Sequence, residues 1–238
     1  MRWHVLLAAA LLLTDARAAT TPASAPPGSV HARYVILKGS IEIAEIDEVY
    51  NRSAGHYSLT STANPLGLLA VFKPGKVIIH SSGMIGPQGL KPLQFSYQRE
   101  GDSQKDSHAD FDWKNRQLSL NHDNQHTRVE LPPGAQDRLS AMYQFMFLNL
   151  HGLHTLDFPM TNGSKLDHYH YTLATGTPFN SSAGQFNTLY LDSGAQPGET
   201  RSQIWLATAR YNLPCKLIIT DPDGGQLTQE LRALDIQP

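Results

Sequence analysis

Short runs of alternating apolar and polar residues dominate this chain of 238 residues and constrain its fold most strongly. Gly, Pro, Asn and Asp separate the runs at intervals of about 8–12 residues. A period of two places successive side chains on opposite faces of a strand. Predicted strands occupy residues 40–51, 76–85, 93–99, 107–113, 116–120, 127–131, 166–173, 185–191, 203–209, 216–220 and 226–234. The pattern predicts an all-β, mainly antiparallel fold, either a rolled sheet or an open barrel.

One segment departs from this alternation and predicts a single central helix. Residues 136–150 place apolar side chains at intervals of three and four. Pro133 precedes the segment and Gly152 follows it, as expected at helix boundaries. The segment is apolar around most of its circumference, so we expect it to pack on the concave face of the sheet. Asp137 is expected to cap the first turn by accepting backbone N–H bonds.

The amino-terminal residues 1–18 have the features of a cleavable export signal. Arg2 is followed by the apolar run 5–13, and small residues at Ala16 and Ala18 form a cleavage site. Nine apolar residues are too few to cross a bilayer core of about 30 Å as a helix. We therefore expect cleavage after Ala18 and a periplasmic protein that is not integral to the membrane.

The remainder of the chain divides into a short leader and one domain. Residues 19–30 are rich in Pro, Ala, Ser and Thr and are expected to form a flexible leader. Residues 31–238 are expected to form a single β domain. Once the three charged residues of the signal are removed, 17 basic and 20 acidic residues remain. This weakly acidic balance has no basic cluster, so nucleic acid is not an expected partner.

Several short motifs follow one another in an order that resembles a known family. They are Ser82-Gly83, Gly89-Leu90-Lys91-Pro92 with Phe95 and Arg99, Ala109-Asp110-Phe111-Asp112-Trp113, Gln136-Asp137-Arg138-Leu139-Ser140, Ile204-Trp205-Leu206-Ala207, Leu213-Pro214 and Asp223-Gly224. Together they resemble the DUF3108 family of exported bacterial proteins of unknown function, over roughly Tyr34 to Leu234. The resemblance implies a periplasmic, largely antiparallel β protein with a rolled or barrel-like sheet. It implies no catalytic residues and no cofactor.

The predicted helix carries the side chains that we expect to line a ligand site if the interior holds a cavity. Leu139, Met142, Phe145 and Met146 lie on its apolar surface, and Met adapts well to the shape of an apolar ligand. This favours a non-enzymatic protein that binds a lipid-like ligand or another envelope protein. A solid core would instead favour a structural or interaction module.

Two histidines on one predicted strand support an alternative hypothesis, a metal-dependent hydrolase. His168 and His170 are two residues apart, so on a strand both imidazoles point to the same face and could reach one metal ion. A zinc site needs at least one further ligand, which the sequence does not locate. The chain also has no Gly-x-Ser-x-Gly elbow, Ser-x-x-Lys pair or His-Glu-x-x-His motif. An exposed strand face, on which His takes the place of another polar residue, is the preferred explanation of the two histidines.

Overall fold

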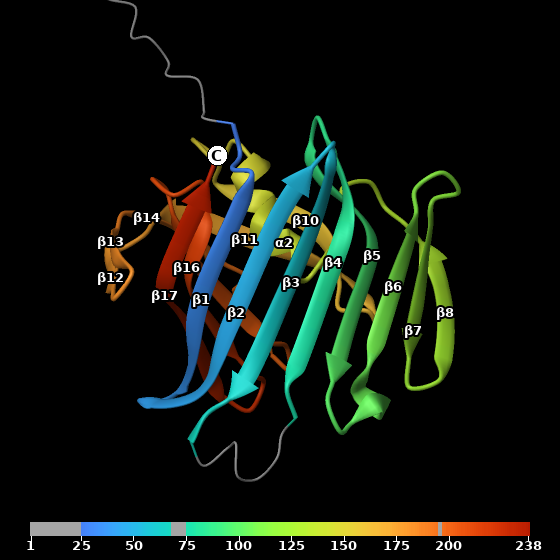
Figure 1. Ribbon diagram of the computed structural model, residues 1–238, viewed down its shortest axis with the longest axis horizontal. Coiled ribbons are helices and arrows are strands. Elements are labelled where there is room, and N and C mark those ends of the chain that lie inside the picture. The colour runs from blue at the N-terminus through green and yellow to red at the C-terminus, as the bar shows by residue number, and fades with distance from the viewer. Residues whose placement is uncertain (1–24, 68–74, 195–196) are drawn as a thin grey trace, which may run out of the picture.

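Antiparallel strands are the main elements of the computed structural model, which describes residues 25–67, 75–194 and 197–238 (Figure 1). Fifteen strands form one sheet in the order β8-β7-β6-β5-β4-β3-β2-β1-β17-β16-β15-β14-β11-β10-β9. β12 and β13 form a separate hairpin. The predicted fold class, all-β and mainly antiparallel, is confirmed.

The first eight strands form a meander in which each strand pairs with the next one in sequence. They are β1 (Ser29–Lys38), β2 (Ile41–Ser53), β3 (His56–Pro65), β4 (Val77–Gly86), β5 (Gly89–Arg99), β6 (Ser107–Asp112), β7 (Gln117–His122) and β8 (Gln125–Glu130). A 3-10 turn, η1 (Ser103–Lys105), lies between β5 and β6. Inward-facing residues alternate with outward-facing ones along these strands, as the period of two requires.

The second half of the chain continues the sheet from the other side of β1. It contributes β9 (Gln136–Asp137), β10 (Thr155–Thr161), β11 (Leu166–Thr175), β12 (Phe179–Ser181), β13 (Gly184–Phe186), β14 (Thr188–Asp192), β15 (Arg201–Ala207), β16 (Leu213–Thr220) and β17 (Gln226–Gln237). β17 pairs with β1 along most of its length, which joins the beginning and the end of the described chain. β9 runs parallel to β10, whereas the other described pairs are antiparallel.

The sheet rolls so that β10 and β9, the strands at one end of the sheet order, lie against the inner side of β4–β6. The side-chain amide Nε2 of Gln136 donates to the carbonyl oxygen of Leu90 on β5 at 2.9 Å. The hydroxyl of Ser107 on β6 donates to the carbonyl oxygen of Asn162, directly after β10, at 2.9 Å. β7 and β8 extend the sheet beyond this contact (Figure 1). The result is a rolled, barrel-like sheet with the short helix α2 (Ser140–Gln144) inside it.

The central helix is shorter than the sequence predicts. α2 covers only Ser140–Gln144, and a 3-10 turn, η2 (Phe145–Phe147), follows it. The first residues of the predicted helix instead form β9, and the backbone N–H of Arg138 donates to the carbonyl oxygen of Thr161 at 2.9 Å. Leu148 then adopts an extended backbone. Pairing with β10 therefore replaces helical hydrogen bonds at the start of this segment, although its apolar periodicity still identifies a buried surface.

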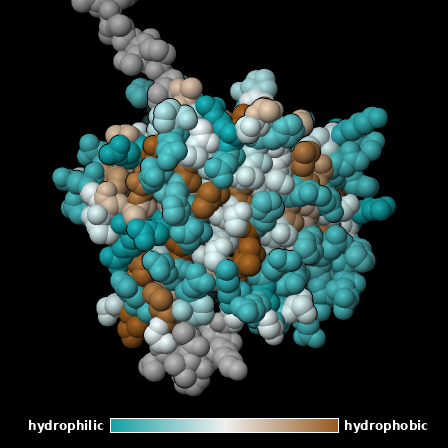
Figure 2. All heavy atoms as spheres, in the orientation of Figure 1, coloured by the Kyte–Doolittle hydropathy of each residue, from teal (hydrophilic) through white to brown (hydrophobic). Residues whose placement is uncertain are grey.

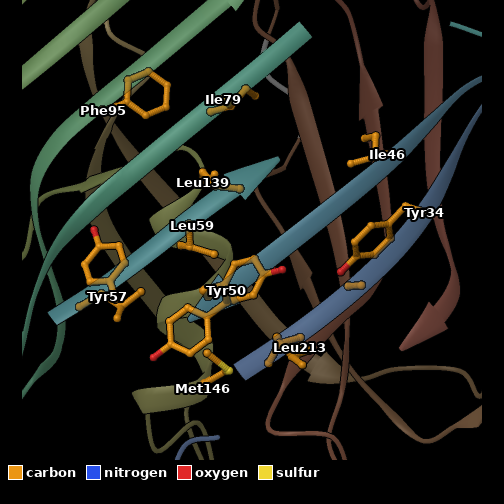
Figure 3. Packing of buried hydrophobic residues seen from close by; sticks show 14 of the residues in the cluster. Tyr34, Ile46, Tyr50, Tyr57, Leu59, Ile79, Phe95, Leu139, Met146 and Leu213 are labelled. Atoms are coloured by element: carbon orange, nitrogen blue, oxygen red, sulfur yellow. The ribbon is translucent and has the colours of Figure 1, made fainter. Parts of the chain in front are cut away.

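The core lies between the α2 segment and the inner face of the sheet. Leu139 lies close to Leu59 and Ile79 of the first strands, and Met146 belongs to the same cluster beside Leu213 (Figure 3). A second cluster gathers around Phe145, from residues of β11, β14 and β15. Both clusters consist mainly of inward-facing residues at alternate strand positions, so the alternation in the sequence accounts for the core directly.

The predicted export signal, residues 1–18, lies outside the described residues. β1 begins at Ser29, two residues before the start predicted for the β domain. Within the described ranges, no helix is long and apolar enough to cross a membrane.

Candidate functional site

The four side chains predicted to line a ligand site all belong to the core. Leu139 is 5% exposed and Met146 is 8% exposed, and both lie in the first core cluster. Phe145 is buried in the second cluster, and the half-buried Met142 packs against both. The structure thus brings the four residues together around one short segment, where they contact strand residues of this chain. Ligand binding by them stays a prediction.

The two histidines of the alternative hypothesis lie on the outer face of β11. Both His168 and His170 are exposed, and Nδ1 of His170 lies 2.6 Å from Oδ1 of Asp157 on β10. Pro159 is the cross-strand partner of His168. Among the described residues, no group of three His, Cys, Asp or Glu side chains is placed to hold a metal ion.

A buried polar network joins the start of α2 to the inner face of β3 and β4. One carboxylate oxygen of Asp137, Oδ1, accepts from the backbone N–H groups of Leu139 at 2.9 Å and Ser140 at 2.8 Å. The other, Oδ2, accepts from the hydroxyl of Ser81 at 2.6 Å. The hydroxyls of Ser81 and Tyr57 lie 3.1 Å apart. The predicted capping role of Asp137 is therefore confirmed, and it is combined with a tertiary contact that the sequence does not indicate.

A second buried carboxylate belongs to Glu48 on β2. It lies on the inner face of the sheet, in the row of cross-strand partners beside the row of Ser81. It accepts from the hydroxyl of Ser61 at 3.0 Å and from the hydroxyl of Tyr143 at 3.1 Å. Burial raises its pKa from 4.5 to about 7, and these two hydrogen bonds only partly oppose that increase. Tyr143 also stacks on Tyr50, with ring centroids 5.6 Å apart. Because the carboxylate is enclosed, this network acts in packing and stability and offers no open reaction centre.

A large open groove lies where β5 and β6 separate. It has a volume of about 940 Å³ and extends from β3 across to the residues just after β6. Its apolar lining consists of Tyr57, Met84, Leu93, Phe111 and Trp113. A mostly apolar concavity of this size matches the usual dimensions of small-molecule sites in proteins.

The groove has a local cause in the sequence of β5. The pairing of β4 with β5 shifts between Ser82 and Gly83, which leaves Leu93 as an extra residue on β5. Such a bulge bends the strand that carries it. Pro92, the residue before it, has no backbone N–H to donate to a neighbouring strand. β5 therefore pairs with β6 only from Gln94 to Tyr97, and the two strands diverge beyond that point.

The side chains of Trp113 and Lys91 line one side of the groove, and contacts with their neighbours hold them in place. The indole Nε1 of Trp113 donates to the carbonyl oxygen of Pro92 at 2.6 Å, and its ring stacks on Phe111 with centroids 6.0 Å apart. The ammonium of Lys91 lies 5.2 Å from the Trp113 ring centroid. A cation at this distance from an indole face makes a favourable contact.

Charged groups of both signs surround this apolar lining. Lys114, Asp110 and Asp112 join Lys91 at the groove. Backbone and side-chain hydrogen bonds from Asn115 lower the pKa of Asp112, so its carboxylate stays ionised. Elsewhere, the outward face of the first strands is mainly hydrophilic, with small separate hydrophobic areas (Figure 2). An apolar lining with a charged rim is a common form of small-molecule site.

Met84, Leu93, Phe111 and Trp113 all occur in predicted strands, but the sequence does not show that they meet in one groove. Phe111 and Trp113 occur in a predicted strand, where they alternate with Asp110 and Asp112, and both of these aspartates are exposed. The divergence of β5 from β6 depends on a bulge, which alternation alone does not indicate. The Pro92-Leu93 pair was the one available signal, since proline disfavours the interior of a sheet.

Comparison with known families agrees with this fold. The profile of the family described as "Protein of unknown function (DUF3108)" matches residues 32–232. The chain belongs to the DUF3108 family. The match confirms the resemblance seen in the ordered motifs, and it extends over almost all of the described sheet. No curated protein matches this DUF3108 chain in sequence.

Solved structures add information on the fold of this DUF3108 protein. A β-barrel-like protein of the DUF1849 domain from Brucella abortus is similar over 90% of this chain and 99% of its own, with a TM-score of 0.53 and 11% identity. A putative lipoprotein from Parabacteroides distasonis matches 88% of this chain and 95% of its own, with a TM-score of 0.34 and 9% identity. The first likeness supports the rolled, barrel-like architecture.

Proposed function

We propose that this DUF3108 protein is an exported, periplasmic, non-enzymatic binding protein that takes a lipid-like apolar group into the groove between β5 and β6. The observation that carries the proposal is the open concavity of about 940 Å³ lined by Met84, Leu93, Phe111 and Trp113. The exposed apolar side chain of Met84, 39% accessible, loses contact with water when such a group binds. The export signal predicted from residues 1–18 supports the periplasmic location.

The charged rim suits an amphipathic ligand. An apolar chain would lie against the Trp113 ring while Lys91, Lys114 and Asp112 contact its polar end or remain in water. The interior of the sheet is a less suitable place for the same ligand, because Leu139, Phe145 and Met146 are buried there against strand residues. We therefore place the apolar ligand in the groove.

Native mass spectrometry of the mature protein, exported through its own signal and purified without denaturant, tests this proposal. We expect a mass excess of lipid size on the wild type. Met84→Lys places a charge in the groove and should remove the adduct. Ile41→Lys is the matched control, because Ile41 is also an exposed apolar strand residue but lies outside the groove.

The other outcomes separate the remaining hypotheses. A bare mass for the wild-type protein would contradict the apolar-ligand proposal. A protein-sized adduct would instead favour an interaction module that recognises another envelope protein. An adduct that persists in Met84→Lys would place the ligand elsewhere, with the residues around α2 as the next candidates.

A further inference from the structure

A second group of side chains, separate from the groove, gathers around Arg138 inside the roll of the sheet. Arg138 lies between β9 and α2, and its side chain is exposed to water. Its guanidinium carbon lies 5.8 Å from the ring centroid of Tyr97 on β5. Neither residue lines the groove between β5 and β6.

Strand register defines the surface beside which Arg138 lies. Tyr97, Ile79, Ser61 and Glu48 are successive cross-strand partners on β5, β4, β3 and β2. They therefore form one row on the inner face of the sheet. Desolvation by the surrounding protein lowers the pKa of Arg138, and its neighbours Tyr97, Tyr169 and Glu48 act in the opposite direction. A guanidinium nevertheless remains charged in proteins.

The adjacent row brings a second guanidinium to the same tyrosine. Arg99 follows Tyr97 by two residues on β5, and its Nη2 donates to the Tyr97 hydroxyl at 3.1 Å. Since that hydroxyl oxygen accepts from Arg99, its own proton is available for a further acceptor. The Nε of Arg99 is buried and has no hydrogen-bond partner among the described residues. Val77 and Ala63, the next side chains of this row, are only half-buried.

The carboxylates near Arg138 are already engaged. Glu48 is hydrogen-bonded by Ser61 and Tyr143, and Asp137 by Ser81 and backbone N–H groups. Asp167, which lies near Tyr169, is paired with Lys165 at 2.7 Å. Among the described residues, no carboxylate lies within ion-pair distance of Arg138. Arg138 is therefore an exposed guanidinium without an ion-pair partner among the described residues, and such a group can bind an anion through charge-assisted hydrogen bonds.

From this arrangement we infer that Arg138 and Tyr97 form a binding site for an oxyanion, a carboxylate or a phosphate, inside the rolled sheet. The Arg138 guanidinium supplies the counter-charge and a planar pair of donors, and the Tyr97 hydroxyl supplies another donor. Tyr97 also positions the guanidinium by contact with its ring. The oxyanion is either a free ion or the head group of an amphiphile whose chain lies along Val77 and Ala63.

Isothermal titration calorimetry of the full mature protein with three probes tests this site. Inorganic phosphate represents the free ion, dodecyl phosphate represents the amphiphile, and dodecyl maltoside is the neutral amphiphile, each below its micellar concentration. We expect dodecyl phosphate or inorganic phosphate to bind, with affinity at least tenfold weaker in Arg138→Gln. Arg128→Gln is the control, because Arg128 is an exposed arginine on the edge strand β8. It should bind like the wild type.

The three probes distinguish a free oxyanion from an amphiphile head group, and they separate binding at Arg138 from binding in the groove. Tighter binding of dodecyl phosphate than of inorganic phosphate, with the difference lost in Arg138→Gln, assigns an amphiphile head group to this site. Equal binding of the two probes, weakened in Arg138→Gln, assigns a free oxyanion. Dodecyl maltoside reports the groove alone, and its binding should not change in Arg138→Gln. If Arg138→Gln does not fold, Tyr97→Phe removes only the hydroxyl and should weaken phosphate binding several-fold. The inference would be overturned if the wild type bound neither phosphate probe. It would also be overturned if the folded Arg138→Gln and Tyr97→Phe variants bound the phosphate probes as tightly as the wild type does.

Discussion

The hydroxyl of Ser81 donates a hydrogen bond of 2.6 Å to the carboxylate of Asp137, two residues that are 56 positions apart in the chain. This bond fixes the start of the α2 segment to the inner face of β4. The same carboxylate accepts from two backbone N–H groups at the beginning of the helix. One buried group thus ends β9, starts α2 and holds both against the sheet.

We expect Asp137→Ala to reduce the free energy of unfolding by about 3 kcal/mol, because it removes three hydrogen bonds and leaves buried donors unpaired. Asp137→Asn is the matched control. Its side-chain oxygen can still accept from Leu139 and Ser140, and its amide can donate to Ser81. Burial also raises the pKa of Asp137, so a neutral side chain is well suited to this position. Urea denaturation measures both variants, and equal stability of the two would contradict the assigned role.

Glu48 should make the stability of the protein depend on pH. Its pKa is about 7 in the folded state against 4.5 for an exposed glutamate, so the folded state binds more protons between these values. Stability should therefore fall as the pH rises from about 4.5 to 7, by up to about 3 kcal/mol from this group. Glu48→Gln should remove this part of the dependence, whereas Glu45→Gln, an exposed neighbour on the same strand, should keep it.

Urea denaturation at pH 5 and pH 8 measures the Glu48 effect. The difference in stability between Glu48→Gln and the wild type should be larger at pH 8 than at pH 5, in favour of the variant. A difference that is independent of pH would show that Glu48 ionises normally in the folded protein.

Gly163 stands where the end of β10 meets β5 and β6, and it should not tolerate a side chain. Its φ is +90°, and an added Cβ would lie 2.6 Å from the Ser107 hydroxyl oxygen. Gly134 also has a positive φ, +74°, but open space at its Cβ position, so Gly134→Ala isolates the backbone strain. We expect a loss of about 1 kcal/mol for Gly134→Ala and about 3 kcal/mol for Gly163→Ala. Thermal unfolding compares the two, and equal losses would argue against tight closure of the roll at Ser107.

Much of this fold could be predicted from the sequence because alternation is a local property. The predicted strands of the meander agree with β2 and β4–β8 to within a few residues. The extent of the central helix could not be predicted in the same way. Its first residues pair with β10, which lies about 20 residues later, and no local pattern records that pairing.

The sites were less accessible to sequence reasoning because they depend on contacts between distant residues. Glu48 reads as one of several acidic residues on an alternating strand, and only the fold places Ser61 and Tyr143 against it. Arg138 occurs in a motif that resembles the family, but its contact with Tyr97 requires β9 to return to β5. The four apolar residues of the predicted helix lie in or against the core, and their role in ligand binding stays a prediction, whereas the groove depends on a bulge at Leu93.

The histidine pair on β11 is open to a direct measurement of metal content. His168 and His170 point outward, and the described residues bring no group of three ligand side chains together. We expect less than stoichiometric zinc in the purified protein and no change in the double variant His168→Ala, His170→Ala, as measured by inductively coupled plasma mass spectrometry. One equivalent of zinc that disappears in the double variant would support the metal-dependent hydrolase instead.

Binding of an apolar chain at Trp113 is the central claim, and fluorescence quenching tests it most directly. In the mature chain, Trp205→Phe leaves Trp113 as the only tryptophan once the predicted signal, with Trp3, is removed. A brominated dodecyl maltoside, kept below its micellar concentration, is a neutral apolar probe whose bromine quenches tryptophan at close range. We predict saturable quenching that Met84→Lys abolishes and Ile41→Lys retains. Quenching that does not saturate, or that is unchanged by Met84→Lys, would contradict the proposed binding groove.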